Sequence, residues 1–118
     1  MNPTRELILE RLREAKPALQ TKFPLKRLAL FGSYARGTQI SGKSDVDILV
    51  EVEPSIGLGF VTLAERLEQI LGQRVDLVSR RAIKPSLWQR IEPELMIVWQ
   101  VLQTSLPEFK RQLASISQ

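Results

Sequence analysis

The sequence predicts an α+β fold, a small mixed β-sheet flanked by helices within a single domain. Short apolar runs at 26–31, 45–50 and 74–78 have the composition of strands, and segments with helical periodicity lie around them. A chain of 118 residues has the size of one domain. It can bury its own core, but it leaves no room for a separate domain that binds an acceptor substrate.

The first expected element is a helix near the N-terminus. Asn2 can act as its N-cap, and Pro3 suits its first position. Pro17 should end or kink this helix. Its apolar residues recur at helical spacing and are Ile8, Leu12, Ala15 and Leu19.

The first strand is expected to lead into a turn that can bind an anion. The strand covers 26–31, Gly32 allows a close approach of the backbone, and Ser33 can open a short helix. Free backbone N–H groups at the start of a helix face outward and attract phosphate. A loop with Gly and Ser residues then runs from 37 to 44.

Two carboxylates belong to the second strand. Because side chains in a strand alternate with a period of two, Asp45 and Asp47 should project from the same face. Mg²⁺ is usually held by one or two carboxylates together with substrate phosphates. The turn and the carboxylates therefore fit one ligand, a metal-bound nucleoside triphosphate.

The middle of the chain supplies one more helix and the third strand. Pro54 to Gly59 breaks the strand pattern, and 60–71 then has an amphipathic helical pattern that Gly72 should end as a C-cap. The strand at 74–78 carries a third carboxylate, Asp76.

The last third of the sequence is less regular. We expect a short helix over 84–92 and a buried strand over 95–102, although the apolar run in the latter also suits a helix. Ser105 and Glu108 form a capping box for a terminal amphipathic helix. This helix either packs on the sheet or docks a partner.

Composition excludes several kinds of chemistry. The sequence contains no Cys and no His, which excludes disulfides, zinc sites built from those residues, and a Cys nucleophile or His base. It shows no signal peptide and no apolar run long enough to span a membrane, so a cytoplasmic protein is expected. Catalysis should depend on carboxylates and metal.

The basic character of the chain does not indicate nucleic-acid binding. The net charge is +4 and the pI about 9.9, but the basic residues form small groups without interleaved aromatic residues. Arg80, Arg81 and Lys84 are more typical of solvated surface than of a phosphate or partner site. Trp88 and Trp99 are expected to pack in or around the core.

These motifs, in their order along the chain, resemble those of the nucleotidyltransferase superfamily that includes DNA polymerase beta. The similarity is greatest to the minimal nucleotidyltransferases (MNT proteins), which read Gly-Ser, about ten residues, then Asp-x-Asp. Here Gly32-Ser33 and Asp45-x-Asp47 are separated by residues 34–44, so the 40–43 loop carries about one extra residue. Loops tolerate such insertions. The resemblance covers about 5–99, which defines a domain over 1–99 and a helical extension over 100–118.

The resemblance implies nucleotidyl transfer with two Mg²⁺ ions. By that resemblance, Asp45, Asp47 and Asp76 would be catalytic and hold the metals, and Asp76 would also be the candidate general base. Gly32 and Ser33 would bind the terminal phosphates of ATP. Arg36 could donate to phosphate oxygens, although a solvated surface arginine is an equally good interpretation.

The resemblance also implies a partner. Minimal nucleotidyltransferases are typically encoded beside HEPN-family ribonucleases in toxin–antitoxin systems, which identifies the chain as an MntA-type antitoxin. It would form a hetero-oligomer and transfer AMP from ATP to a toxin tyrosine. Two alternatives stay open: a non-catalytic antitoxin that occludes its toxin, and a nucleotidyltransferase that modifies a small molecule. The intact aspartate triad disfavours the first, and the missing acceptor domain disfavours the second.

Overall fold

A computed structural model describes residues 4–40 and 42–101 of the chain. The predicted terminal helix lies outside the described residues, as do Asn2 and Pro3. The helices are α1 (Arg5–Lys22), α2 (Gly32–Arg36), α3 (Gly59–Leu71) and α4 (Pro85–Ile91). The strands are β1 (Leu25–Phe31), β2 (Val46–Val52), β3 (Val75–Ser79) and β4 (Met96–Gln100). Three 3-10 turns complete the path: η1 (Pro54–Ile56), η2 (Arg80–Ala82) and η3 (Glu92–Glu94).

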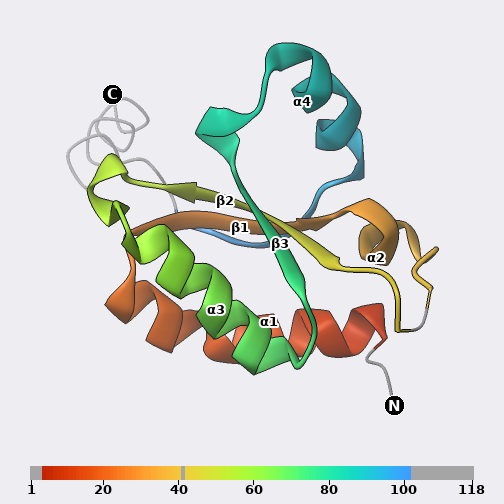
Figure 1. Cartoon of the computed structure of the whole chain (residues 1–118), viewed down its shortest axis with the longest axis horizontal. Helices are drawn as coiled ribbons and strands as arrows, with labels where there is room; N and C mark the ends of the chain where they lie inside the picture. Colours follow the sequence, from red (N-terminus) through yellow and green to blue (C-terminus); the bar gives the residue numbers. More distant parts are fainter. Residues whose placement is uncertain (1–3, 41, 102–118) are drawn as a thin grey trace, which may run out of the picture.

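The four strands form one mixed sheet in the order β3-β2-β1-β4 (Figure 1). β1 is antiparallel to both β2 and β4, whereas β2 and β3 are parallel. The predicted mixed α+β architecture is therefore confirmed, and the last apolar run is a strand as expected. Asp45 lies immediately before β2 rather than within it.

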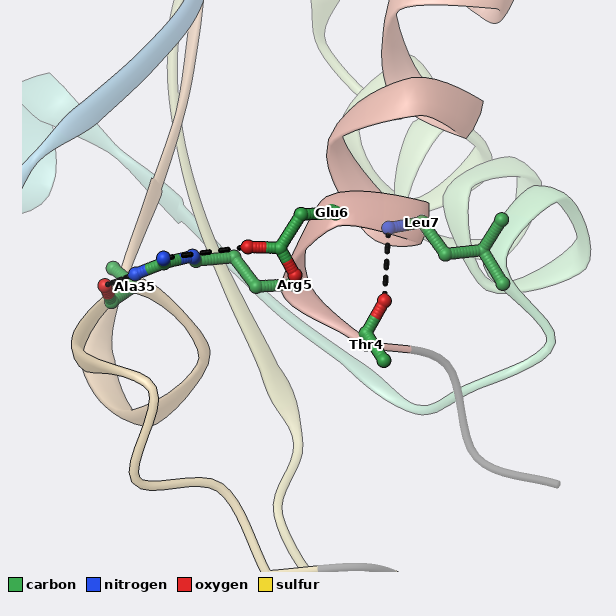
Figure 2. A network of polar contacts seen from close by, with 5 residues as sticks. All are labelled: Thr4, Arg5, Glu6, Leu7 and Ala35. Atoms are coloured by element: carbon green, nitrogen blue, oxygen red, sulfur yellow. Dashed lines mark hydrogen bonds and ion pairs between the residues drawn. The ribbon is translucent and has the colours of Figure 1, made fainter.

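Thr4 determines where α1 begins. Its hydroxyl accepts a hydrogen bond from the Leu7 N–H at 3.2 Å, the usual contact of an N-cap side chain (Figure 2). The prediction of Asn2 as the N-cap is therefore wrong by two residues. Next to the cap, the Arg5 guanidinium donates to the Ala35 carbonyl at 3.0 Å, and Figure 2 shows this side chain reaching across to α2.

Pro17 does not end α1, which continues to Lys22. A proline inside a helix removes one backbone hydrogen bond, at a typical cost of about 3 kcal/mol. Pro17 itself is exposed, while Leu12 and Leu19 on either side of it are buried in the core. Burial of the apolar face across the proline therefore outweighs the lost bond, and the expectation of a helix end at Pro17 is wrong.

Two apolar clusters occupy the two faces of the sheet. α1 and α3 lie on one face (Figure 1), where side chains such as Leu12, Leu63 and Leu67 are fully buried against the strands. On the opposite face, a smaller cluster joins the sheet to α4 and contains Ala29, Leu49, Ile83 and Ile91. This second, thinly covered face is the one from which the site opens.

Both tryptophans pack as expected. Trp99 on β4 is buried in the main cluster. Trp88 on α4 packs partly against the smaller cluster, and the Arg80 guanidinium lies 3.8 Å from its ring centroid. Within the described residues, no helix is both long and apolar enough to cross a membrane.

Candidate functional site

Three adjacent strands bring the site together at one end of the sheet. In the antiparallel pair, Phe31 at the end of β1 is the partner of Asp47 in β2. In the parallel pair, Asp47 is the partner of Asp76 in β3. Because partner residues in a sheet project from the same face, the two carboxylates are neighbours beside the turn that follows β1.

The Gly32 backbone lies directly against the Asp47 carboxylate. Gly32 has φ 73°, and a Cβ atom at this position would overlap Asp47 Oδ2 and lie 2.9 Å from its Cγ. Any side chain at residue 32 would be unfavourable for two reasons: the positive φ of the backbone and the overlap with the Asp47 carboxylate. The close approach that the glycine permits is to the carboxylate of β2.

The Asp47 carboxyl holds its proton unusually tightly. Burial raises its pKa from 3.8 to about 6, and the charges of Asp76, Asp45 and Glu94 act in the same direction. The Arg36 guanidinium opposes the shift. Gathered carboxylates that repel one another in this way favour a cation between them.

Asp45 has a different environment from Asp47. Its Oδ1 lies 3.2 Å from Arg74 Nε, and both side chains are substantially exposed. The same oxygen atom is buried and accepts no hydrogen bond, so the ion pair leaves it without a directional partner. Asp45 Oδ1 therefore has an ion-pair partner but accepts no hydrogen bond, and the Asp45 charge contributes to the raised pKa of Asp47.

These carboxylates have suitable chemistry for a divalent metal ion, because Mg²⁺ prefers oxygen ligands. The adjacent carboxylates of Asp47 and Asp76 offer such oxygens, and Asp45 lies two residues before Asp47 along the chain. In the described ranges, however, no three side chains of Asp, Glu, His or Cys are close enough to form a ready-made metal site. The structure thus brings Asp47 and Asp76 together and directs Asp45 toward Arg74.

A cavity of about 450 Å³ lies over the carboxylate pair. Gly32, Arg36, Asp47 and Asp76 line it from the sheet and α2, while α4 forms the opposite wall. Ser33 occupies the second position of α2 but does not line this cavity. Of the candidates predicted from the sequence, four therefore share one cavity.

Glu94 also lines this cavity, and sequence reasoning missed it. Its Oε1 accepts from the Gly32 N–H at 3.2 Å, and its Oε2 accepts from Arg36 Nη1 at 3.0 Å. No local sequence pattern predicts that Glu94 contacts Gly32 and Arg36, because about sixty residues separate it from them.

Comparison with known protein families identifies the fold. The model of the Nucleotidyltransferase domain family matches residues 12–99. A protein of Methanocaldococcus jannaschii, named as a candidate protein adenylyltransferase, is 44% identical over 96 residues, covering 77% of this chain and 94% of its own. The protein adenylyltransferase MntA of Thermococcus cleftensis is 41% identical over 85 residues, covering 70% of this chain and 84% of its own.

A solved structure has the same arrangement of elements. A chain in the crystal structure of a toxin–antitoxin with AMP-PNP superposes with a TM-score of 0.64 at 27% identity. The match covers 91% of this chain and 86% of that one. The resemblance read from the Gly-Ser and aspartate motifs is thereby confirmed.

Proposed function

Because the chain belongs to the nucleotidyltransferase domain family, and is thus a nucleotidyltransferase, we propose that it is an antitoxin that transfers AMP from Mg-ATP to a tyrosine hydroxyl of a HEPN-family ribonuclease toxin. The observation that carries the proposal is the Asp47–Asp76 pair in a cavity lined by the Gly32 turn. The MntA relative is named a protein adenylyltransferase, which supports a protein acceptor. The crystal structure with AMP-PNP supports a toxin as the partner.

The proposed reaction exchanges one bond at the α-phosphorus of ATP for another. The acceptor oxygen attacks the α-phosphorus of ATP, the bond to the β-phosphate oxygen breaks, and pyrophosphate leaves. Asp76, which is exposed beside Asp47, would accept the phenolic proton. The Gly32 N–H and Arg36 guanidinium are the donors for phosphate oxygens.

Asp47 and Asp76, joined by Asp45, would hold the Mg²⁺ ions that the family uses. When bound, such ions polarise the phosphoryl group and offset charge on the leaving pyrophosphate. With the ions bound, the carboxylates would position the nucleotide beside the Gly32 backbone, which lies directly against Asp47. Asp45 would exchange its ion pair with Arg74 for this role.

The acceptor in this proposal comes from another molecule. The cavity is bounded by the sheet, α2 and α4, and its wall residue Leu87 is exposed, so an approaching partner would contact it. A protein side chain brings its own binding surface with it. A small-molecule acceptor would depend on the lining of this cavity for its binding.

The test uses purified chain, Mg²⁺ and ATP labelled at the α-phosphate. We expect label on the HEPN-family toxin, its loss when EDTA removes the metal, and its loss when toxin tyrosines are replaced by phenylalanine. Label on an aminoglycoside but not on toxin would favour the small-molecule enzyme. Toxin that is bound and inhibited without label would favour occlusion.

A further inference from the structure

Glu94 occupies an anion position at the wall of the cavity. The residue lies in η3, the turn between α4 and β4, and its side chain is 27% exposed. One carboxylate oxygen accepts from the Gly32 N–H and the other from Arg36. Two donors from α2 thus converge on a single negatively charged group that belongs to a distant part of the chain.

A phosphate group of a nucleotide requires the same kind of donors. Backbone N–H groups and guanidinium groups bind phosphate and carboxylate oxygens in the same way, through charge-assisted hydrogen bonds. Arg36 has other N–H groups to offer, but the single Gly32 N–H cannot donate fully to both anions at once. Nucleotide phosphate at this position must therefore compete with Glu94.

The charges around the cavity favour displacement when a triphosphate enters. Glu94 lines the same cavity as Asp47 and Asp76, and its charge already raises the pKa of Asp47. A triphosphate adds further negative charge, which makes a nearby carboxylate unfavourable. The Arg36–Glu94 pair is partly exposed, so it is weak enough to exchange.

We infer that Glu94 is a positioning residue that holds the Gly32 N–H and Arg36 toward the phosphate position and is displaced by the nucleotide. The inference rests on the proposed function, since it names nucleotide phosphate as the competing anion. In this role Glu94 acts through the Gly32 N–H and Arg36 and not on the acceptor or the reacting phosphorus. Its effect should therefore appear in nucleotide affinity and KM more than in kcat.

The test compares Glu94→Gln with Glu92→Gln in binding of Mg-ATP and of inorganic triphosphate. Glu92 is an exposed residue of the same turn, so its substitution removes the same charge without touching Arg36. Glu94→Gln should tighten both ligands by about two- to fivefold, the range expected for releasing a partly exposed ion pair. It should lower the KM for ATP in proportion and leave kcat within about twofold.

A second readout uses the wild-type chain and does not depend on the variant folding. The side-chain NMR signal of Arg36 should shift on adding triphosphate, toward its position in Glu94→Gln. Two results would overturn the inference: Glu94→Gln binds Mg-ATP and triphosphate no more tightly than the wild type, or the Arg36 signal does not shift when triphosphate is added. Tighter triphosphate binding without any AMP transfer would instead leave the inference standing and contradict the proposed function.

Discussion

Asp47 is held under electrostatic stress that a bound cation would relieve. Its carboxyl is partly buried, lies beside Asp76 and is packed against the Gly32 backbone. A group in this position destabilises the folded chain once it ionises. The ionised carboxyl lowers the stability of the ligand-free protein and raises its affinity for a cation.

This stress gives a pH-dependent prediction for Asp47→Asn. The carboxyl has a pKa of 3.8 in the unfolded chain and about 6 in the folded one, so the folded state binds the proton more tightly. The free energy of unfolding of the wild type should fall as pH rises through this interval. That of Asp47→Asn should not, because the variant has no carboxyl at this position. In EDTA we expect Asp47→Asn to have the higher Tm at pH 8 and nearly the wild-type Tm near pH 4.

Mg²⁺ provides the matching control for that measurement. It should raise the Tm of the wild type at pH 8 and leave that of Asp47→Asn almost unchanged, because the variant lacks the carboxylate. AMP transfer should be lost in the variant at every pH. A variant no more stable than wild type at pH 8 in EDTA would contradict this picture of Asp47.

Gly32 should be intolerant of any side chain, and Gly37 provides its control. Both have positive φ, but a Cβ on Gly37 meets nothing within 4 Å whereas one on Gly32 overlaps Asp47. Gly37→Ala should cost about 1 kcal/mol of unfolding free energy, and Gly32→Ala about 1–3 kcal/mol more. Urea unfolding measures both.

The same two variants should differ in activity. Gly32→Ala displaces the Asp47 carboxylate and should lower AMP transfer by about 100-fold, the cost typical of a misplaced reacting group. Gly37→Ala should retain near wild-type transfer. Equal activity of the two would show that contact with Asp47 is unimportant.

At the residue scale, the sequence predicted the parts of the site that are local. Gly32, Asp47 and Asp76 lie in or beside apolar strands, and the order of their motifs along the chain, which resembles that of the family, predicted that they belong to one site. Glu94 could not be found in this way, because its contact with Gly32 depends on how η3 returns to the sheet. The ion pair of Asp45 with Arg74 is likewise a tertiary contact.

At the scale of elements, α3 supports the strand that carries Asp76. Leu63, Leu67 and Leu71 are fully buried against the sheet. The Glu68 carboxylate accepts the Val75 N–H at 3.1 Å, which ties this helix to the start of β3. The position of Asp76 therefore depends on how firmly α3 packs.

Truncation on the two faces of α3 should have very different costs. Leu67→Ala removes a fully buried side chain and should lower the unfolding free energy by about 2–5 kcal/mol. Val61→Ala, at a side chain that is 58% exposed, should change it by less than about 1 kcal/mol. Chemical denaturation gives both values, and similar costs would contradict the assigned core face.

The elements also show where local rules fail. Helical periodicity predicted α1 and α3, which each bury one continuous face, and apolar runs predicted the four strands, of which β1 and β2 are buried on both faces. The predicted N-cap of α1, Asn2, was wrong, and so was a helix end at Pro17, one of the two outcomes predicted there. The proline was given more weight than burial of the helix on both sides of it, whereas the observed cap, Thr4, is a local signal that Asn2 displaced in the prediction.

At the scale of the molecule, the asymmetry of the two layers determines how an acceptor can approach. α1 and α3 fill one face of the sheet, while the opposite face carries the carboxylates and is covered chiefly by α4. The exposed apolar residues Leu87 and Ile97 belong to α4 and to the edge strand β4. A partner protein that reached Asp76 would meet this side of the molecule.

The most direct test of the central claim is the intact mass of a HEPN-family toxin after co-expression with this chain. A variant with both Asp45→Asn and Asp47→Asn is the control, because it keeps the size of both side chains and removes their charge. We predict that the wild type adds one or more AMP-sized increments to the toxin and that the variant adds none. An unmodified toxin that both forms bind and inhibit would contradict the account.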